Sequence, residues 1–179
     1  MPGTPVIYYG DEIGMGDNIY LGDRNGVRTP MQWSPDRNAG FSKADPERLY
    51  DQPIINPLCS YQMINIEAQE RTPTSLLHWM KRIIDLRRQH HEIFGRGSMT
   101  MLEPANSRCL AYLRALSGQT LLIVNNLSRY AQSVELDLSS LRGWTPIEMF
   151  GHSRFHPVGD GPYTLTLAPH GFFWLRMER

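Results

Sequence analysis

Two adjacent carboxylates, Asp11 and Glu12, are the acidic pair whose position most suggests chemistry, because they directly follow a short apolar run. Hydrolysis of a glycosidic bond uses two carboxylates that flank the bond. Neighbouring residues on an extended chain, however, point to opposite faces. We therefore expect Asp11 and Glu12 to bind backbone groups at the end of the run and not to form a catalytic couple.

The histidines and the short sequence motifs give no sign of a metal or cofactor. His90 and His91 are adjacent and would point roughly 100° apart on a helix, a poor arrangement for sharing one metal ion. His152 and His156 lie between Gly151 and Pro157, which predicts a loop. The sequence has no Walker loop, GxGxxG, HExxH or GxSxG motif. We expect neither metal nor cofactor in this chain.

Composition excludes several classes of partner. The 179 residues carry 18 Lys+Arg and 18 Asp+Glu, so the net charge is zero, which argues against binding to nucleic acid or to an anionic membrane. No run approaches the roughly 18 apolar residues of a membrane-spanning helix, and the first residues lack a signal-peptide pattern. Cys59 and Cys109 lack CxxC spacing and are expected to be ordinary buried thiols. These features predict a cytoplasmic protein.

The elements that must position any site begin with residues 5–9 (PVIYY), an apolar run bounded by glycines. Its lack of polar alternation predicts a strand that is buried on both faces, as in a parallel sheet. Residues 11–72 show no sustained period but contain many large apolar side chains, so we expect an ordered loop and not a disordered linker. Long ordered loops after parallel strands often carry enzyme sites.

A helix is expected next, with Thr72 as N-cap, Pro73 at the first position and an end at Gly95 and Gly97. The remaining chain predicts a small antiparallel β-sandwich, because short β-rich runs are separated by turn residues at hairpin-like intervals. The seven runs are residues 99–102, 109–116, 119–125, 133–138, 146–150, 163–167 and 172–177. Residues 134–138 alternate cleanly, so one face of that strand should be exposed.

Two motifs resemble one known enzyme family. Residues 1–15 (MPGTPVIYYGDEIGM) are similar to the last barrel strand of the α-amylase superfamily, glycoside hydrolase family 13. Residues 23–33 (DRNGVRTPMQW) resemble the loop that follows it in the α-glucosidase and isomerase branch. Residues 16–22 (GDNIYLG) and 64–69 (INIEAQ) narrow the resemblance to members that interconvert maltose and trehalose.

The resemblance implies an α+β fragment: residues 1–97 would be the last strand, active-site loop and last helix of a β/α (TIM) barrel, and residues 98–179 an antiparallel β-sandwich. The family's three catalytic carboxylates come from earlier strands, one of them in a His-Asp pair, and this sequence contains no His-Asp dipeptide. A barrel of this type needs about 250 residues. We therefore expect the chain to be catalytically silent by itself.

The implied parent enzyme would interconvert maltose and trehalose, its small-molecule sugar substrates, by retaining intramolecular glucosyl transfer. Two alternatives remain open. The same loop motif serves α-glucosidases and α-amylases, so the parent could be a hydrolase. The sandwich could also be a non-catalytic module that binds glucan or mediates assembly, although no clearly spaced pair of exposed aromatics supports this.

The resemblance places Arg28 at the rim of the active site, where a planar guanidinium could bind sugar hydroxyls in a fork. A structural ion pair with Asp23 or Asp36 is the alternative for Arg28. Arg24 is a weaker candidate for the same substrate-binding role.

Most of the aromatic residues are expected to serve packing. Trp33 and Tyr20 are expected mainly as buried aromatics that pin the loop, with stacking on a pyranose as the alternative. Four aromatics of the sandwich are expected in core or interdomain packing, namely Trp144, Phe172, Phe173 and Trp174.

Overall fold

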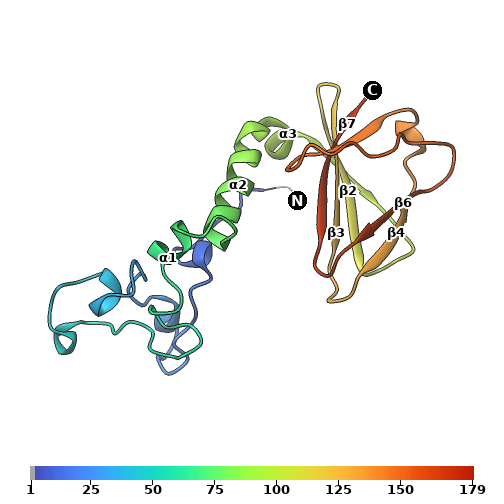
Figure 1. Ribbon diagram of the computed structural model, residues 1–179. Helices are drawn as coiled ribbons and strands as arrows, with labels where there is room; N and C mark the ends of the chain where they lie inside the picture. The colour runs from blue at the N-terminus through green and yellow to red at the C-terminus, as the bar shows by residue number, and fades with distance from the viewer. Residues whose placement is uncertain (1–2) are drawn as a thin grey trace. The chain divides into compact units, whose positions relative to one another are not determined.

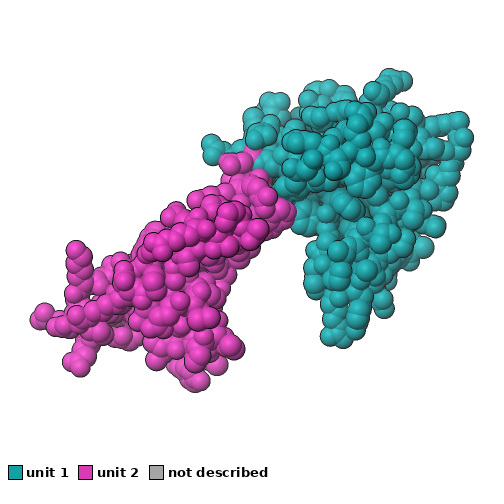
Figure 2. Space-filling model, viewed as in Figure 1, with its two compact units in different colours: residues 1–4, 86–179 teal, residues 5–85 magenta. Residues whose placement is uncertain are grey.

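The computed structural model describes residues 3–179. It contains two compact units, one of which spans Pro5–Asp85 and the other contains Leu86–Arg179 (Figure 2). The division falls inside a helix, α2 (Leu76–Gln89). Each unit is described separately below. None of the helices within the described residues is long and apolar enough to cross a membrane.

The unit that contains Leu86–Arg179 includes the predicted antiparallel β-sandwich (Figure 1). Its larger sheet has five strands in the order β1-β2-β3-β7-β5, and β4 and β6 pair in a second sheet. The strands are β1 (Ser98–Leu102), β2 (Cys109–Leu116), β3 (Gln119–Asn126), β4 (Gln132–Leu136), β5 (Thr145–Glu148), β6 (Tyr163–Leu167) and β7 (Phe172–Glu178). A short 3-10 turn, η5 (Ser139–Leu141), follows β4. Each of the seven β-rich runs therefore overlaps one strand.

The main core of the sandwich lies between its two sheets. Leu122 and Val124 of β3 and Leu175 of β7 are completely buried there, facing Leu165 of β6 and Val134 of β4. The predicted alternation along residues 134–138 is confirmed, because every second side chain is buried and those between are exposed. Period-two burial of this kind fixes the register of each strand, since a slip of one residue would expose its apolar set.

The opposite face of the five-stranded sheet is covered by α3 (His91–Arg96). Ile93 and Phe94 of this helix pack against Tyr112, Leu121 and Ile123. The helix expected to run to Gly95 is thus two helices. The chain leaves helical geometry at His90 (φ −112°, ψ 30°), which allows α3 to turn its apolar residues onto the sheet.

A buried arginine joins α3 to the sheet. Arg114 of β2 is 1% exposed, and its Nη2 donates to the carbonyls of Ile93 (3.1 Å) and Phe94 (2.9 Å). Its Nε and Nη1 have no hydrogen-bond partner among the described residues. The Ile93 carbonyl also accepts the Gly97 N–H at 3.1 Å, and the last carbonyls of a helix carry partial negative charge, so a cation is well suited to this place.

Helix α2 begins later than the sequence predicts. Its N-cap is Ser75, whose hydroxyl accepts a hydrogen bond from the His78 N–H at 3.4 Å. Thr72 is not the cap, because its hydroxyl donates to the Ala68 carbonyl and its own carbonyl accepts the Ser75 N–H. Residues 72–75 therefore form a turn in front of the helix.

The other unit consists mainly of loops joined by short turns. These are η1 (Asp11–Ile13), η2 (Asn25–Val27), η3 (Arg37–Gly40), η4 (Pro46–Arg48) and the short helix α1 (Ile66–Glu70). Ile13, Met31 and Leu77 form a small core. The Gln69 side chain donates to the Ile13 carbonyl (2.7 Å) and accepts the Leu77 N–H (3.0 Å), so α1 ties the first turn to α2.

The prediction of a buried strand at residues 5–9 is wrong for the chain as described. No strand forms there, and Val6 is 91% exposed, while Ile7, Tyr8 and Tyr9 are also exposed. A strand of a parallel sheet is buried only by its neighbours and by the helices that cover both faces. The described residues of this unit supply no neighbouring strand, so the apolar run remains unpaired.

Amide exchange should distinguish the paired strands of the sandwich from the unpaired run at residues 5–9. The amides of Leu122 and Val124 lie in the central strand β3, between β2 and β7, and should exchange at rates set by unfolding of the sandwich. The amides of Val6 and Ile7 have no partner among the described residues and should exchange within the first time points. Hydrogen–deuterium exchange with mass spectrometry on a dilute monomer measures both regions. Slow exchange at Val6 and Ile7 would show that this run pairs with another strand.

Candidate functional site

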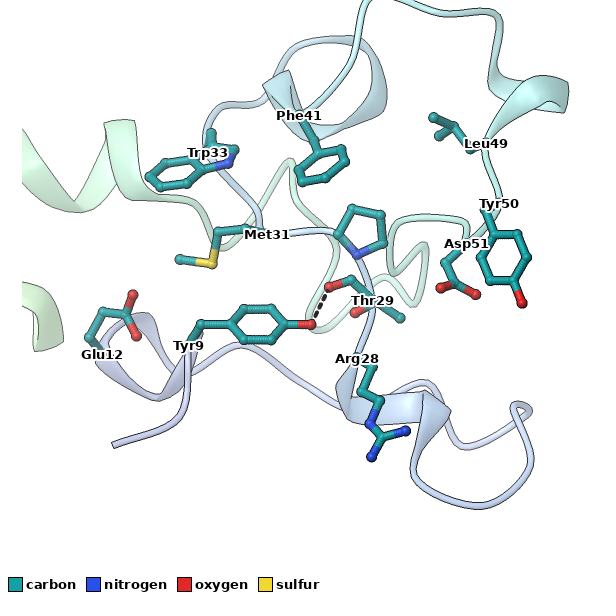
Figure 3. Close-up of a pocket in the computed structure, with 11 residues that line it drawn as sticks. Tyr9, Glu12, Arg28, Thr29, Met31, Trp33, Phe41, Leu49, Tyr50 and Asp51 are labelled. Atoms are coloured by element: carbon teal, nitrogen blue, oxygen red, sulfur yellow. Dashed lines mark hydrogen bonds between the residues drawn. The ribbon is translucent and has the colours of Figure 1, made fainter. Parts of the chain in front are cut away.

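A hollow of about 510 Å³ opens in the loop-rich unit (Figure 3). Its wall comes from four separate stretches of the chain, which are brought together by the turns η1 to η4. The lining residues are Tyr9, Glu12, Arg28, Thr29, Pro30, Met31, Trp33, Phe41, Leu49, Tyr50 and Asp51. The wall combines aromatic surface with one guanidinium and two carboxylates. Such a mixture suits a ligand that has apolar faces and hydroxyl edges.

Tyr9 connects the first segment to the loop. Its hydroxyl donates to the Thr29 carbonyl at 2.9 Å. Tyr9 is only partly covered, but the loss of water around its phenol is still the largest cause of its raised pKa. Tyr8 and the Asp51 carboxylate add to the rise, and the Arg28 charge opposes it. The phenol therefore keeps its proton at neutral pH and remains a hydrogen-bond donor. Thr29 itself is completely buried, and its hydroxyl oxygen has no partner among the described residues.

The acidic pair at the start of the loop binds backbone groups, which confirms the prediction. Glu12 Oε2 accepts the Gly10 N–H at 2.8 Å, and Asp11 Oδ2 accepts the Tyr8 N–H at 2.9 Å. Gly10 has a φ of +95°, so this turn needs a residue without a side chain. Glu12 thus lines the hollow while it holds the turn.

The two arginines singled out from the sequence lie together. They flank η2, with Arg24 before it and Arg28 after it, and both line a second hollow of about 350 Å³. Arg28 lines both hollows. Figure 3 shows its side chain extending away from Trp33 and Phe41.

The structure does not form the ion pairs considered for Arg28. Its guanidinium makes no ion pair or hydrogen bond with Asp23, Asp36 or any other residue that the structure describes. Asp36 instead accepts the Ser34 hydroxyl at 3.1 Å. An exposed guanidinium at the edge of a hollow is available to bind a ligand. The substrate-binding role of Arg28 and Arg24 remains a proposal.

Close packing at Gly26 shapes the turn between these arginines. A Cβ at this position would lie 2.0 Å from Asp17 Oδ1 and 2.6 Å from the Asn18 carbonyl oxygen. The Gly26 carbonyl also accepts the Asn18 N–H at 3.1 Å. Only glycine therefore fits at position 26, in the middle of the turn that carries Arg24 and Arg28.

Two aromatics differ from their expected burial. Tyr20 is 88% exposed and Trp33 is 50% exposed, so neither pins the loop by being buried. Trp33 lines the hollow, whereas Tyr20 lies beside a different one, lined also by Ile54 and Ile55.

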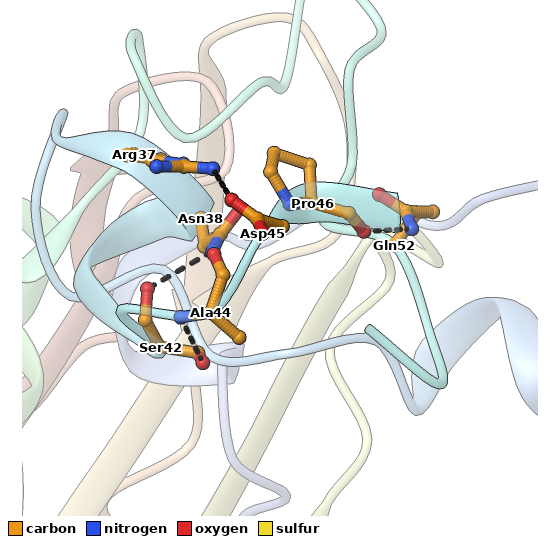
Figure 4. Close-up of polar contacts among 7 residues, drawn as sticks. All are labelled: Arg37, Asn38, Ser42, Ala44, Asp45, Pro46 and Gln52. Atoms are coloured by element: carbon orange, nitrogen blue, oxygen red, sulfur yellow. Dashed lines mark hydrogen bonds and ion pairs between the residues drawn. The ribbon is translucent and has the colours of Figure 1, made fainter. Parts of the chain in front are cut away.

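Several lining residues were not singled out from the sequence as site candidates. Phe41, Leu49, Tyr50 and Asp51 lie in a stretch without any repeating pattern, and only the folded loop brings them to the hollow. Polar contacts hold this stretch (Figure 4). Arg37 pairs with Asp45 at 2.7 Å, and the Gln52 amide donates to the Pro46 carbonyl at 2.8 Å.

The aromatics of the sandwich serve packing, as predicted. Trp174 packs against Phe94 and Phe150, with ring centroids 5.0 and 5.5 Å apart. Phe173 and Trp144 pack against the core between the sheets. Among the described residues of the sandwich, Tyr130 is the one aromatic that is largely exposed. A glucan-binding face with two exposed aromatics is therefore not present in this part of the chain.

Neither cysteine lines the hollow, and the described residues form no metal-binding cluster. Cys109 is buried, which raises the pKa of its thiol, whereas Cys59 is only half-buried, contrary to the prediction. Both thiols are free. The described residues contain no group of three or more His, Cys, Asp or Glu side chains that could hold a metal ion.

Comparison with known proteins matches both parts of the chain. Residues 1–97 match the family model of the alpha amylase catalytic domain, and residues 99–174 match that of the maltogenic amylase C-terminal domain. A protein named trehalose synthase from Pimelobacter sp. is 53% identical over 99% of this chain and 31% of its own length. One of the same name from Thermus thermophilus is 54% identical over 96% of this chain and 18% of its own length.

The fold is shared with solved structures of longer proteins. The crystal structure of Bacillus licheniformis trehalose-6-phosphate hydrolase matches 99% of this chain with a TM-score of 0.75 at 23% identity, and the match covers 36% of that chain. This likeness shows the fold alone. The chain spans about a third or less of the length of the two curated relatives named above.

Proposed function

Because this chain belongs to the alpha-amylase catalytic-domain family, we propose that it is the C-terminal part of an enzyme that interconverts maltose and trehalose. The observation that carries the proposal is the identity of 53% over nearly the whole chain to the trehalose synthase of Pimelobacter sp.. In this proposal residues 1–97 end a catalytic β/α barrel and residues 98–179 form its β-sandwich domain. The hollow beside Arg28 then belongs to the active site.

The proposed reaction is a retaining intramolecular glucosyl transfer. A carboxylate from the rest of the barrel attacks the anomeric carbon of maltose and forms a glucosyl ester, while an acid group there protonates the leaving glucose. The freed glucose turns in the closed site, and its anomeric hydroxyl gives its proton back to that group and attacks the ester, which releases the carboxylate and yields trehalose. This chain would contribute the wall that holds the free glucose. Maltose and trehalose are the proposed small-molecule substrates, and the two free thiols support a cytoplasmic location.

Arg28 would retain the free glucose. A planar guanidinium binds two neighbouring hydroxyls at once, and Arg28 has no competing ion pair with any described residue. Closure of the site also excludes water, which competes with glucose for the glucosyl ester. Loss of Arg28 should therefore favour hydrolysis over isomerisation. Part of a hydrolase is the alternative, and the product ratio separates the two.

Arg28→Ala should raise the share of glucose among the products from maltose. The change is made in a chimera in which this chain replaces the matched 31% of the Pimelobacter protein. We expect trehalose formation to fall about tenfold or more, as for the loss of a charged hydrogen bond of about 1.5–3 kcal/mol. Hydrolysis should fall less. Arg28→Lys keeps the charge without the fork and should rescue only partly.

Arg48→Ala is the matched control, because Arg48 is an exposed arginine of the same unit that lines neither hollow. Chromatography of the sugars gives the ratio of trehalose to glucose, and thermal melting reports stability. An unchanged ratio with a lowered melting temperature would assign Arg28 a structural role. An unsubstituted chimera that forms only glucose would support the hydrolase alternative.

A further inference from the structure

Three successive residues of η3 adopt the left-handed backbone conformation. The φ angles are 57° at Asn38, 59° at Ala39 and 67° at Gly40. L-residues other than glycine rarely adopt this conformation, and Asn and Asp do so more often than Ala. Asn38 and Ala39 are also buried. Strained backbone of this kind persists where the surrounding contacts fix it, and it is often found beside functional sites.

Hydrogen bonds and one ion pair with the residues that follow it stabilise the left-handed turn (Figure 4). The Asn38 amide Nδ2 donates to the carbonyls of Ser42 at 3.0 Å and Ala44 at 2.8 Å. The Arg37 guanidinium pairs with Asp45 directly beyond them. The Asn38 carbonyl accepts the Phe41 N–H at 2.9 Å. These bonds close the loop on itself and stabilise the left-handed turn.

The turn presents the Ala39 carbonyl to Trp33. This oxygen accepts the backbone N–H of Trp33 at 2.9 Å and the backbone N–H of Ser34 at 3.1 Å. The close approach needs glycine at position 40, where a Cβ would lie 2.5 Å from the Ser34 hydroxyl oxygen. A right-handed turn would aim the carbonyl elsewhere and leave both N–H groups without this partner.

Trp33 is also held from its other side. Its carbonyl accepts the Glu67 N–H at 3.0 Å, and the Gln32 carbonyl accepts the Ile66 N–H at 3.0 Å, so α1 anchors the same stretch. The Trp33 backbone is thus fixed by two elements, yet its ring is half exposed and lines the hollow. Figure 3 shows Trp33 and Phe41 on one side of Met31, and Tyr9 and Arg28 on the other.

We propose that Trp33 is the stacking surface for a pyranose ring in this hollow and that the left-handed turn at residues 38–40 is the positioning element that holds it. An indole offers a flat apolar face to the C–H face of a sugar. A rigid platform loses little conformational entropy on binding. The inference rests on the proposed function, since it identifies a sugar-binding residue of the same site.

The first test measures the binding of glucose by calorimetry to the chimera defined above. Trp33→Ala should raise the Kd for glucose about tenfold, and Trp33→Phe, which keeps an aromatic face, should raise it less. Tyr130→Ala is the matched control, since Tyr130 is an exposed aromatic of the sandwich and does not line the hollow. If folded Trp33→Ala binds glucose with a Kd within about twofold of the Kd of Tyr130→Ala, Trp33 is not the stacking surface.

The second test compares Asn38→Ala with Asn38→Gly in the same chimera. Both remove the amide, but only glycine adopts the left-handed conformation freely. If the turn positions Trp33, the Kd for glucose should rise clearly in Asn38→Ala and lie nearer the unsubstituted value in Asn38→Gly. A merely structural residue would lower the melting temperature and the folded fraction and leave the Kd of the folded protein unchanged. That result would overturn the positioning role.

The two proposals fail differently. Formation of trehalose from maltose by the unsubstituted chimera tests the proposed function. Glucose is not consumed, so its Kd reports the site without turnover. A chimera that binds glucose through Trp33 but forms no trehalose would overturn the function and leave the binding site. A chimera that forms trehalose but shows no effect of Trp33→Ala on glucose binding would overturn only the stacking role of Trp33. A chimera that does not bind glucose would overturn that role as well.

Discussion

Arg114→Ala should lower the free energy of unfolding of the sandwich by about 3 kcal/mol or more. The substitution removes two hydrogen bonds from a charged donor to the carbonyls of Ile93 and Phe94. Bonds of this type contribute about 1.5–3 kcal/mol each. It also leaves a cavity beneath α3, which costs about 2–5 kcal/mol when a large buried side chain becomes alanine. Against these losses stands the relief of a buried charge that has no carboxylate partner among the described residues.

Arg114→Met separates these contributions. Methionine fills most of the volume without the charge, and replacing buried ionic groups by apolar residues of similar size is often neutral or stabilising. We expect Arg114→Met to lie within about 1 kcal/mol of the unsubstituted chain. Urea unfolding of the sandwich, followed by far-ultraviolet circular dichroism, gives both values. A loss below about 1 kcal/mol for Arg114→Ala would show that the cost of the buried charge outweighs its hydrogen bonds.

The sandwich could be predicted from the sequence because its strands are short, regular and bounded by turn residues. The predicted runs 109–116 and 163–167 coincide with β2 and β6, and the alternation at residues 134–138 matches the burial. Period two is a local property that needs no knowledge of the partner strand. The run at residues 5–9 shows the limit. Its composition is that of a buried strand, but burial depends on neighbours that the described residues do not include.

The loop could be predicted only in part. Its acidic residues were correctly expected to bind backbone groups, and Arg24 and Arg28 were singled out through a family resemblance, not through any local rule. Asn65 caps α1 by accepting the Ala68 N–H, a signal that was present in the sequence, but a helix of five residues shows no clear period. Ala39 adopts a left-handed conformation that its residue type disfavours, and only tertiary contacts explain it.

The 179-residue chain alone should convert maltose to trehalose or glucose no faster than background. The family resemblance assigns catalysis to three carboxylates on earlier barrel strands, and no position of this chain matches the His-Asp pair. Glu12 lines the hollow but already accepts the Gly10 N–H. Loss of a single catalytic group costs roughly 10⁴-fold or more in comparable enzymes. The rate per molecule should therefore be at least about 10⁴-fold below that of the chimera.

Chromatography of sugars after long incubation with maltose measures this rate, and the chimera prepared in parallel is the positive control. A contaminating glucosidase would give glucose that does not scale with the purified chain, so the test follows product against protein concentration. The variant Glu12→Gln removes a carboxylate that lines the hollow and should leave the background rate of maltose conversion unchanged. If product scales with the chain and falls in Glu12→Gln, catalysis would be located in these residues, and the assignment of the catalytic carboxylates to the rest of the barrel would be wrong. If the chain is inactive while the chimera forms trehalose, the catalytic groups lie in another part of the enzyme, and the contribution of Arg28 and Trp33 is then measured by the binding and product-ratio tests above.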